Sequence, residues 1–347
     1  MNNNFIDFLN KFSENDWLQT LDRLLSEIHV VDRNAVQIWF RFYPLELARA
    51  LQTAEERAKL VQQFVLQGDY ELTNQIDSSH RFLYGHRFWS DVKKAIEARA
   101  ESFSGENAHL ANQIKQIAQT VSEKTKTDKS LLIGIVAVGL MTLTQVGFDT
   151  FKNASGKTEK PRGLMNNSPQ KIINERAKDD WQGIFGFLKT VDKKWTVRYE
   201  SSKSGDGKFK MTNDEEIASG AQRDQSQNWR EADIRCGEGV IPVECRSAAC
   251  GTCWIGVLEG AEKLSEVSTR ERKQMKIFGY RQGDDAKPIL RLACQARANG
   301  SISIVIPPWN GVFGKKIYGN VADVELEPAT TSAKKLRETI SSATENN

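Results

Sequence analysis

The sequence predicts a multidomain protein in which an all-α N-terminal domain precedes a C-terminal domain of the α+β class. The chain has 347 residues, which is more than one compact core usually holds. Apolar residues recur at helical spacing in the first third, whereas strand-like alternation begins only after residue 192. All five cysteines lie between Cys236 and Cys294, a concentration that indicates a local site rather than a disulfide framework.

The composition excludes several classes of protein. There are 48 Lys+Arg and 45 Asp+Glu residues, 39% of the chain is hydrophobic and the mean hydropathy is -0.51. These values are typical of a globular chain, not of a polytopic membrane protein or a wholly disordered one. No basic stripe is interleaved with aromatic residues, so no nucleic-acid partner is expected. The absence of cysteine before residue 236, and of a signal-peptide pattern at the N-terminus, predicts a reducing, cytoplasmic location.

Residues 1–129 are predicted to form the helical domain. Apolar residues such as Trp17, Leu21 and Leu24 recur at helical spacing, and polar breaks divide the stretch into several helices. His80 and His86 lie in the aromatic segment HRFLYGHRFW, which could line a haem or quinone pocket. Two histidines six residues apart do not share a helix face, however, and aromatic residues most often form core.

An apolar helix is predicted over residues 130–148. These nineteen residues, SLLIGIVAVGLMTLTQVGF, contain no charge, and their length suits a hydrocarbon core, so the segment is a transmembrane candidate. The charges that flank it would place the C-terminal domain on the cytoplasmic side. The alternative is a helix buried in the N-terminal bundle or in a homo-oligomer formed through it.

Residues 149–191 have the composition of a polar linker, with one helix expected near 172–188. Strand-like alternation at 195–200, a turn, and residues 208–211 then predict a β-hairpin. Residues 229–239 are expected to form a short helix. The stretch 311–347 is expected to be a C-terminal extension with a disordered tail.

Four cysteines have the spacing of a metal centre: Cys245-x4-Cys250-x2-Cys253, with Cys294 forty residues later. Such a compact loop with a distant fourth ligand can wrap a two-iron cluster. The loop residues between the cysteines are small, which allows backbone N–H groups to approach sulfur atoms. A structural zinc site would normally pair two Cys-x2-Cys knuckles, and only one is present. Cys236 is expected to be a buried structural residue.

The segments VIPVECRSAACGTCWIGVLEG and RLACQARANGSISIVIPP make residues 192–310 resemble a plant-type [2Fe-2S] ferredoxin domain. The resemblance implies a β-grasp fold and a [2Fe-2S] cofactor held by Cys245, Cys250, Cys253 and Cys294. Further strands are then expected at 254–258, 289–292 and 301–306, with a helix at 269–278.

The chain departs from that family in three ways. Ala248 stands where the family usually has glycine, which matters if the position requires a positive φ. The gap before Cys294 is longer than usual, and the excess is assigned to residues 268–287. Residues 192–310 hold 19 basic and 17 acidic side chains, whereas plant ferredoxins are strongly acidic. A partner selected by a large basic docking face is therefore not expected.

The sequence thus predicts a one-electron carrier, not an enzyme, that exchanges electrons with a partner oxidoreductase. No catalytic triad, phosphate loop or dinucleotide fingerprint is present, so no catalytic residue is assigned. Two alternatives stay open: a redox-sensing or adaptor protein in which the helical domain acts, and the iron–sulfur subunit of a larger oxidoreductase complex.

Overall fold

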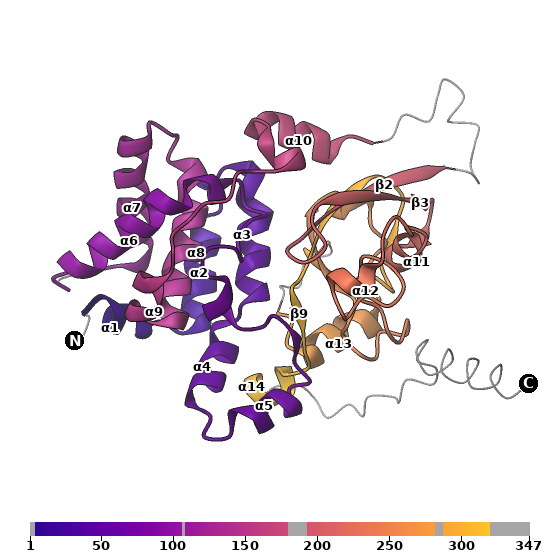
Figure 1. Ribbon diagram of the computed structural model, residues 1–347, viewed down its shortest axis with the longest axis horizontal. Coiled ribbons are helices and arrows are strands. Elements are labelled where there is room, and N and C mark those ends of the chain that lie inside the picture. The colour runs from indigo at the N-terminus through magenta and orange to yellow at the C-terminus, as the bar shows by residue number, and fades with distance from the viewer. Residues whose placement is uncertain (1–3, 106–107, 180–192, 282–286, 320–347) are drawn as a thin grey trace, which may run out of the picture. The chain divides into compact units, whose positions relative to one another are not determined.

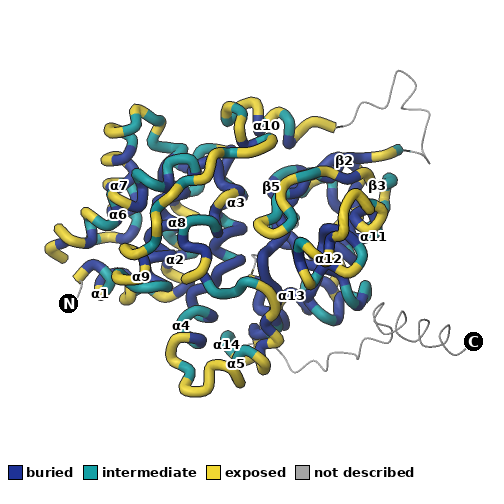
Figure 2. The backbone as a smooth tube through the Cα atoms, viewed as in Figure 1, coloured by how far each residue is buried: buried dark blue, intermediate teal, exposed yellow. Residues whose placement is uncertain are grey.

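The computed structural model describes residues 4–105, 108–179, 193–281 and 287–319 (Figure 1). The chain divides into two compact units, each with its own buried core (Figure 2). Unit 1 comprises Met1–Glu55 and Glu71–Glu175, and unit 2 comprises Glu56–Tyr70 and Arg176–Asn347. Residues 320–347 of the predicted tail and residues 180–188 of the helix predicted at 172–188 lie outside the described residues.

Unit 1 is helical, as predicted, throughout the part that the structure describes. Its α-helices are α1 Asn4–Asn10, α2 Glu14–Leu24, α3 Val30–Phe42, α4 Leu45–Thr53, α6 Trp89–Ser102, α7 Leu110–Thr125, α8 Ser130–Val146 and α9 Phe148–Asn153. Three 3-10 helices join them: η1 Leu72–Gln75, η2 Tyr84–Phe88 and η3 Gly163–Asn166. Helix α10, Pro169–Ala177, lies where the two units meet in the sequence.

Local polar contacts fix where these helices begin. At α2, Ser13 Oγ accepts a hydrogen bond from the Asp16 N–H at 3.2 Å, and the Asp16 carboxylate accepts one from the Ser13 N–H at 2.8 Å. At η2, the buried Asp32 carboxylate accepts bonds from the N–H groups of Tyr84 and Gly85. Both arrangements satisfy N–H groups that a helix cannot pair internally.

Helix α8 corrects the prediction of a transmembrane segment. It spans 17 residues, and all of its residues 132–145 are buried within unit 1. A Cβ built on Gly134 would lie 2.5 Å from the Val36 side chain of α3, and one on Gly139 would lie 2.6 Å from Ile96 of α6. Neighbouring helices therefore supply the apolar surroundings that the sequence requires, as in the buried-helix alternative.

Among the described residues, no helix has both the length and the apolar character needed to cross a membrane.

Unit 2 contains a mixed five-stranded sheet with strand order β3-β2-β8-β5-β6. The strands are β2 Lys194–Ser201, β3 Gly207–Thr212, β5 Trp254–Glu259, β6 Leu290–Leu292 and β8 Ile302–Ile306. Strands β2 and β8 are parallel, and the other neighbours are antiparallel. The predicted hairpin and the three further predicted strands are therefore confirmed. Strand β8, with the sequence ISIVI, is buried at every position, Ser303 included, as expected for a strand with neighbours on both sides.

Short elements complete unit 2. Two short strand pairs lie outside the main sheet: β1 Gln67–Gly68 with β9 Trp309–Asn310, and β4 Glu215–Glu216 with β7 Arg297–Ala298. The described helices of unit 2 are α5 Arg57–Gln63, α11 Ile217–Gln222, α12 Trp229–Ala232, η5 Ala261–Lys263, α13 Thr269–Phe278 and α14 Gly314–Tyr318. Helix α13 has the predicted bounds, because Ser268 Oγ accepts from the Glu271 N–H at 3.0 Å and Gly279 ends the helix with a φ of +93°. Helix α12 is shorter than predicted.

Residues 56–70, here called the arm, belong to unit 2 although the sequence analysis placed them in the helical domain. Strand β1 of the arm pairs antiparallel with β9. The buried Phe64 ring lies 6.3 Å from the Phe313 ring, and the Phe64 carbonyl accepts a bond from the Val312 N–H at 2.6 Å. Gly68 has a φ of +81°, and a Cβ there would lie 2.4 Å from the Pro308 carbonyl, so a side chain would not fit.

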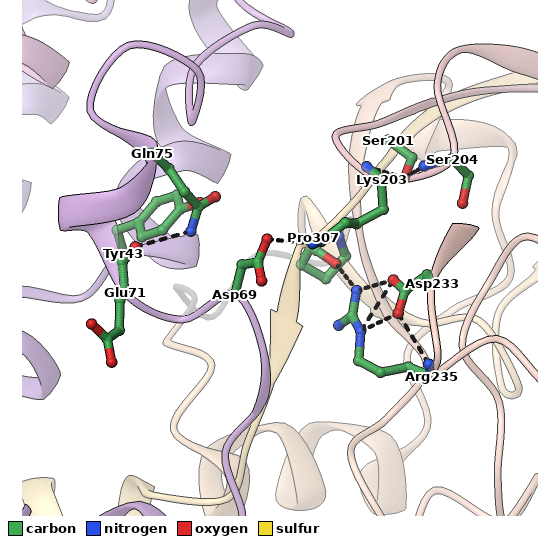
Figure 3. A network of polar contacts seen from close by, with 10 residues as sticks. All are labelled: Tyr43, Asp69, Glu71, Gln75, Ser201, Lys203, Ser204, Asp233, Arg235 and Pro307. Carbon is green, nitrogen blue, oxygen red and sulfur yellow. Dashed lines mark hydrogen bonds and ion pairs between the residues drawn. The ribbon is translucent and has the colours of Figure 1, made fainter. Parts of the chain in front are cut away.

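An ion pair holds the end of the arm (Figure 3). The Asp69 carboxylate lies 2.6 Å from Lys203 Nζ, in the turn after β2. Nearby, Arg235 donates to both oxygens of Asp233 and to the Pro307 carbonyl at 2.9 Å. Arg235 and Asp233 side chains are 3% and 6% exposed, so solvent screens this pair little. The arm is thus fixed by strand pairing, apolar contact and charge together.

Candidate metal centre

Two neighbouring strands place two of the four predicted cysteines side by side, at the start of β5 and after the end of β6. Cys253 directly precedes β5, and Cys294 follows β6 after one intervening residue. Trp254 and Leu292 are register partners in these antiparallel strands, and the Ala293 N–H donates to the Cys253 carbonyl at 2.9 Å. The loop that carries Cys245 and Cys250 returns to the same place.

The four thiols form two hydrogen-bonded pairs. Cys250 donates to Cys245, which lowers the pKa of Cys245 to about 5 and raises that of Cys250. Cys253 likewise donates to Cys294, lowering the pKa of Cys294 and raising that of Cys253. Each pair therefore contains one cysteine whose surroundings favour the thiolate, which is the form that binds metal.

Backbone N–H groups surround the sulfur atoms. The N–H groups of Ser247 and Ala249 donate to Cys245 Sγ at 3.4 and 3.2 Å. The N–H of Ala248 bonds to the Cys294 thiol, and the backbone and hydroxyl of Thr252 bond to the Cys250 thiol. Such donors stabilise negative charge on sulfur.

The loop obtains this geometry from three residues in left-handed backbone conformations. Arg246, Ala248 and Gly251 have φ values of +54°, +60° and +69°. The family usually has glycine at the position of Ala248, and the structure places this alanine in the conformation for which glycine is suited. The cost of such a conformation is about 1–2 kcal/mol for a residue with a side chain. A Cβ on Gly251 would lie 2.9 Å from the Phe278 ring, so this position also lacks room.

Arg246 holds the loop to helix α11. Its guanidinium donates to Ser219 Oγ at 3.1 Å, to Gln222 Oε1 at 2.8 Å and to Glu238 Oε2 at 2.6 Å. Because Glu238 balances its charge, Arg246 contributes a smaller positive potential at the cysteines than a lone arginine would. Neither Ser219 nor Glu238 was identified by the sequence analysis, since nothing in their local pattern points to the loop.

Tyr280 supports the opposite side of the loop. Its hydroxyl lies 3.4 Å from the Gly251 carbonyl and 3.0 Å from the Gly311 carbonyl, and it accepts from the Gly311 N–H at 3.0 Å. The ring stacks on Trp254 with centroids 3.8 Å apart. Burial raises the pKa of Tyr280, so the phenol stays protonated. No local sequence pattern points to this role of Tyr280.

Exposure is uneven around the centre. Cys245, Cys253 and Cys294 are buried, at 5%, 3% and 0% exposed, whereas Cys250 is half-buried. The side of the centre at Cys250 therefore lies closest to solvent.

Cys236 lies apart from these contacts, as its predicted structural role requires. It is 1% exposed, and its Sγ donates to the Val240 carbonyl at 3.2 Å. Burial raises its pKa to about 12, so it stays a thiol at neutral pH.

The donor set fits a two-iron cluster. Among the described residues, no three His, Cys, Asp or Glu side chains converge as a single metal ion would require. The cysteines are instead divided two and two, and a [2Fe-2S] cluster distributes its four cysteines over two irons in this way. The small loop residues and the N–H groups directed at sulfur agree with the same cofactor.

The two histidines considered in the sequence analysis do meet, in the core of unit 1. His80 Nδ1 and His86 Nδ1 lie 2.9 Å apart, and the His80 ring lies 4.3 Å from the Trp89 ring. The turn before η2, rather than a shared helix face, brings them together. Their aromatic surroundings are those of a core, and within the described part of unit 1 no third ligand joins them.

Residues 221–299 match the family model of the 2Fe-2S iron-sulfur cluster binding domain. The matched segment includes all four cysteines of the centre and lies within unit 2. No solved structure matches the chain. The chain therefore carries, at residues 221–299, a 2Fe-2S iron-sulfur cluster binding domain with a [2Fe-2S] cluster as its cofactor.

Proposed function

We propose that the protein is a one-electron carrier whose cluster is held by Cys245, Cys250, Cys253 and Cys294 and that it exchanges electrons with a partner oxidoreductase. The observation that carries this proposal is that Cys253 and Cys294 lie side by side where β5 begins and β6 ends, while backbone N–H groups of the cluster loop donate to Cys245 Sγ. A [2Fe-2S] cluster accepts and releases a single electron. The β-grasp fold implied by the resemblance belongs to the same proposal, and the mixed sheet of unit 2 is consistent with it.

The protein's own residues have three tasks in such transfer. The cysteines hold the cluster, and the N–H groups of Ser247, Ala248 and Ala249 stabilise the negative charge on their sulfurs. The half-buried Cys250 gives a partner its shortest approach, while the buried positions exclude water from the remainder. No acid or base is needed, because no proton has to move with the electron. Within the described part of unit 2, the polar side chains at the centre serve to position the loop.

The experiment that tests the proposal is metal and sulfide analysis of the anaerobically purified chain, with paramagnetic resonance of the reduced form. We expect two irons and two sulfides per chain. Cys250→Ser and Cys294→Ala should lose the cluster, whereas Cys236→Ala, a buried cysteine outside the two pairs, should keep it. A normal cluster in Cys294→Ala would exclude the proposed ligand set.

A second measurement separates a carrier from a subunit of a larger complex. A carrier reduced by a soluble reductase should pass its electron to a separate acceptor and be reduced again over many cycles. If the isolated chain is reduced once and cannot be reoxidised by any soluble acceptor, the subunit interpretation is favoured instead.

A further inference from the structure

The side-chain amide of Gln295 lies between the two segments that carry the cysteines. Its Nε2 is 3.5 Å from Cys294 Sγ, 2.9 Å from the Cys294 carbonyl and 3.4 Å from the Arg246 carbonyl. Arg246 directly follows Cys245 in the first-ligand loop, 49 residues before Gln295. One amide group therefore bridges the loop and the fourth cysteine.

The orientation of this amide follows from its partners. Carbonyl oxygens accept hydrogen bonds and cannot donate them, so the atom that faces Arg246 and Cys294 has to be the NH2 group. This group has two protons for three acceptors, and the sulfur shares one of them with a carbonyl. Gln295 is thus a donor to the Cys294 side of the centre.

Water cannot replace this donor, because Cys294 is 0% exposed. In the structure its sulfur receives hydrogen bonds from the Cys253 thiol, the Ala248 N–H and Gln295. When Cys253 binds iron its thiol proton is lost, so among these three donors only Ala248 and Gln295 are left. A lost N–H···S contact would therefore leave buried negative charge with one donor fewer.

We propose that Gln295 is a positioning residue for the [2Fe-2S] cluster: it ties the Arg246 carbonyl to the Cys294 segment and directs an N–H dipole at the Cys294 sulfur. The inference rests on the proposed ligand set. Because the reduced cluster carries one more negative charge than the oxidised cluster, the dipole stabilises the reduced form more. Gln295 thus raises the reduction potential.

The test compares the full chain with Gln295→Met, Gln295→Glu and the control Gln274→Met. Methionine and glutamate approximate the length and bulk of glutamine, but methionine donates no hydrogen bond and an ionised glutamate places a negative charge there. Gln274 is buried on α13, whereas Gln295 is half-buried, so Gln274→Met controls for the loss of a glutamine amide elsewhere in unit 2. The measurements are iron and sulfide content, a potentiometric titration of the cluster and the paramagnetic resonance spectrum.

We expect the ratio of reduced to oxidised cluster at a fixed potential to fall about fivefold in Gln295→Met. This factor corresponds to the loss of one hydrogen bond worth about 1 kcal/mol. This ratio corresponds to a midpoint lower by about 40 mV, at 59 mV per tenfold change for one electron. The midpoint potential of Gln295→Glu should fall further, and that of Gln274→Met should stay at the parent value. Gln295→Met keeps the bulk of the side chain and loses only its amide. If this variant folds but loses the cluster, the hydrogen bonds of the Gln295 amide are needed to hold the two ligand segments together.

An unchanged midpoint and spectrum in both Gln295 variants would overturn the inference while leaving the proposed function intact. If the parent chain itself lacks two irons and two sulfides, the proposed function fails instead. The two failures are therefore distinguishable.

Discussion

Replacing Phe64 in the arm should destabilise unit 2, although the residue lies in the N-terminal half of the sequence. The side chain is 2% exposed and packs against Phe313. Truncation of a buried phenylalanine to alanine costs about 3–5 kcal/mol. Because a domain is stable by only about 5–15 kcal/mol, Phe64→Ala should remove a large part of the free energy of unfolding of unit 2.

Native-state hydrogen exchange of the full chain measures this effect unit by unit. The free energy of opening should fall for amides of β8 and β9 and stay unchanged for those of α8. Gln62→Ala is the matched control, since the Gln62 side chain is exposed on α5 of the same arm and its truncation should have little effect. Unchanged protection in β8 and β9 of Phe64→Ala, or a loss confined to α8, would refute the assignment of the arm to unit 2.

Three further predictions concern charge. Glu271 and Arg291 form a bidentate ion pair, and both side chains are 1% exposed. Glu271→Gln should therefore lower the free energy of unfolding in urea by about 3–5 kcal/mol, because it leaves a buried charge unpaired. A Glu271→Leu/Arg291→Met double variant should recover much of this loss. Burial lowers the pKa of His80 well below its usual value and that of His86 to about 4, so the thermal midpoint of unit 1 should fall as the pH decreases from about 6.5 towards 4, and less so in His86→Gln. Electron transfer should slow only slightly across a salt series, because residues 192–310 hold 19 basic and 17 acidic side chains; a steep loss of rate would indicate a strongly charged docking face.

The metal centre could be predicted largely from the sequence because its chemistry constrains local spacing. Three thiols in nine residues, separated by small side chains, leave few alternatives to a cluster loop. The hairpin and α13 were predictable for a similar reason. Strand alternation, a serine before α13 and a glycine after it are all local signals.

The environment of the apolar helix α8 could not be predicted from local sequence alone. A charge-free stretch is stable in lipid and in a protein core for the same physical reason, and only its neighbours distinguish the two. Those neighbours, Val36 and Ile96 among them, lie 98 and 43 residues before the glycines they approach. The arm presents the same difficulty, because β1 pairs with a strand more than 200 residues away.

The residues that support the metal centre could not be predicted from local sequence patterns either. Gln295 adjoins a predicted ligand, yet its role depends on the position of the Arg246 carbonyl. Helix α11 similarly joins both ligand segments: Ala218 N–H donates to the Ala293 carbonyl at 3.0 Å, while Ser219 accepts from Arg246. Such contacts exist only after the chain has folded.

Tyr280 joins the cluster loop to the segment that follows β9. A phenol has one proton, so Tyr280 can donate to the Gly251 carbonyl or to the Gly311 carbonyl but not fully to both. The Gly311 carbonyl is closer, at 3.0 Å against 3.4 Å, and the Gly311 N–H bonds to the same hydroxyl. The stronger contacts of the hydroxyl therefore go to the segment that follows β9, and the loop at Gly251 receives the weaker one.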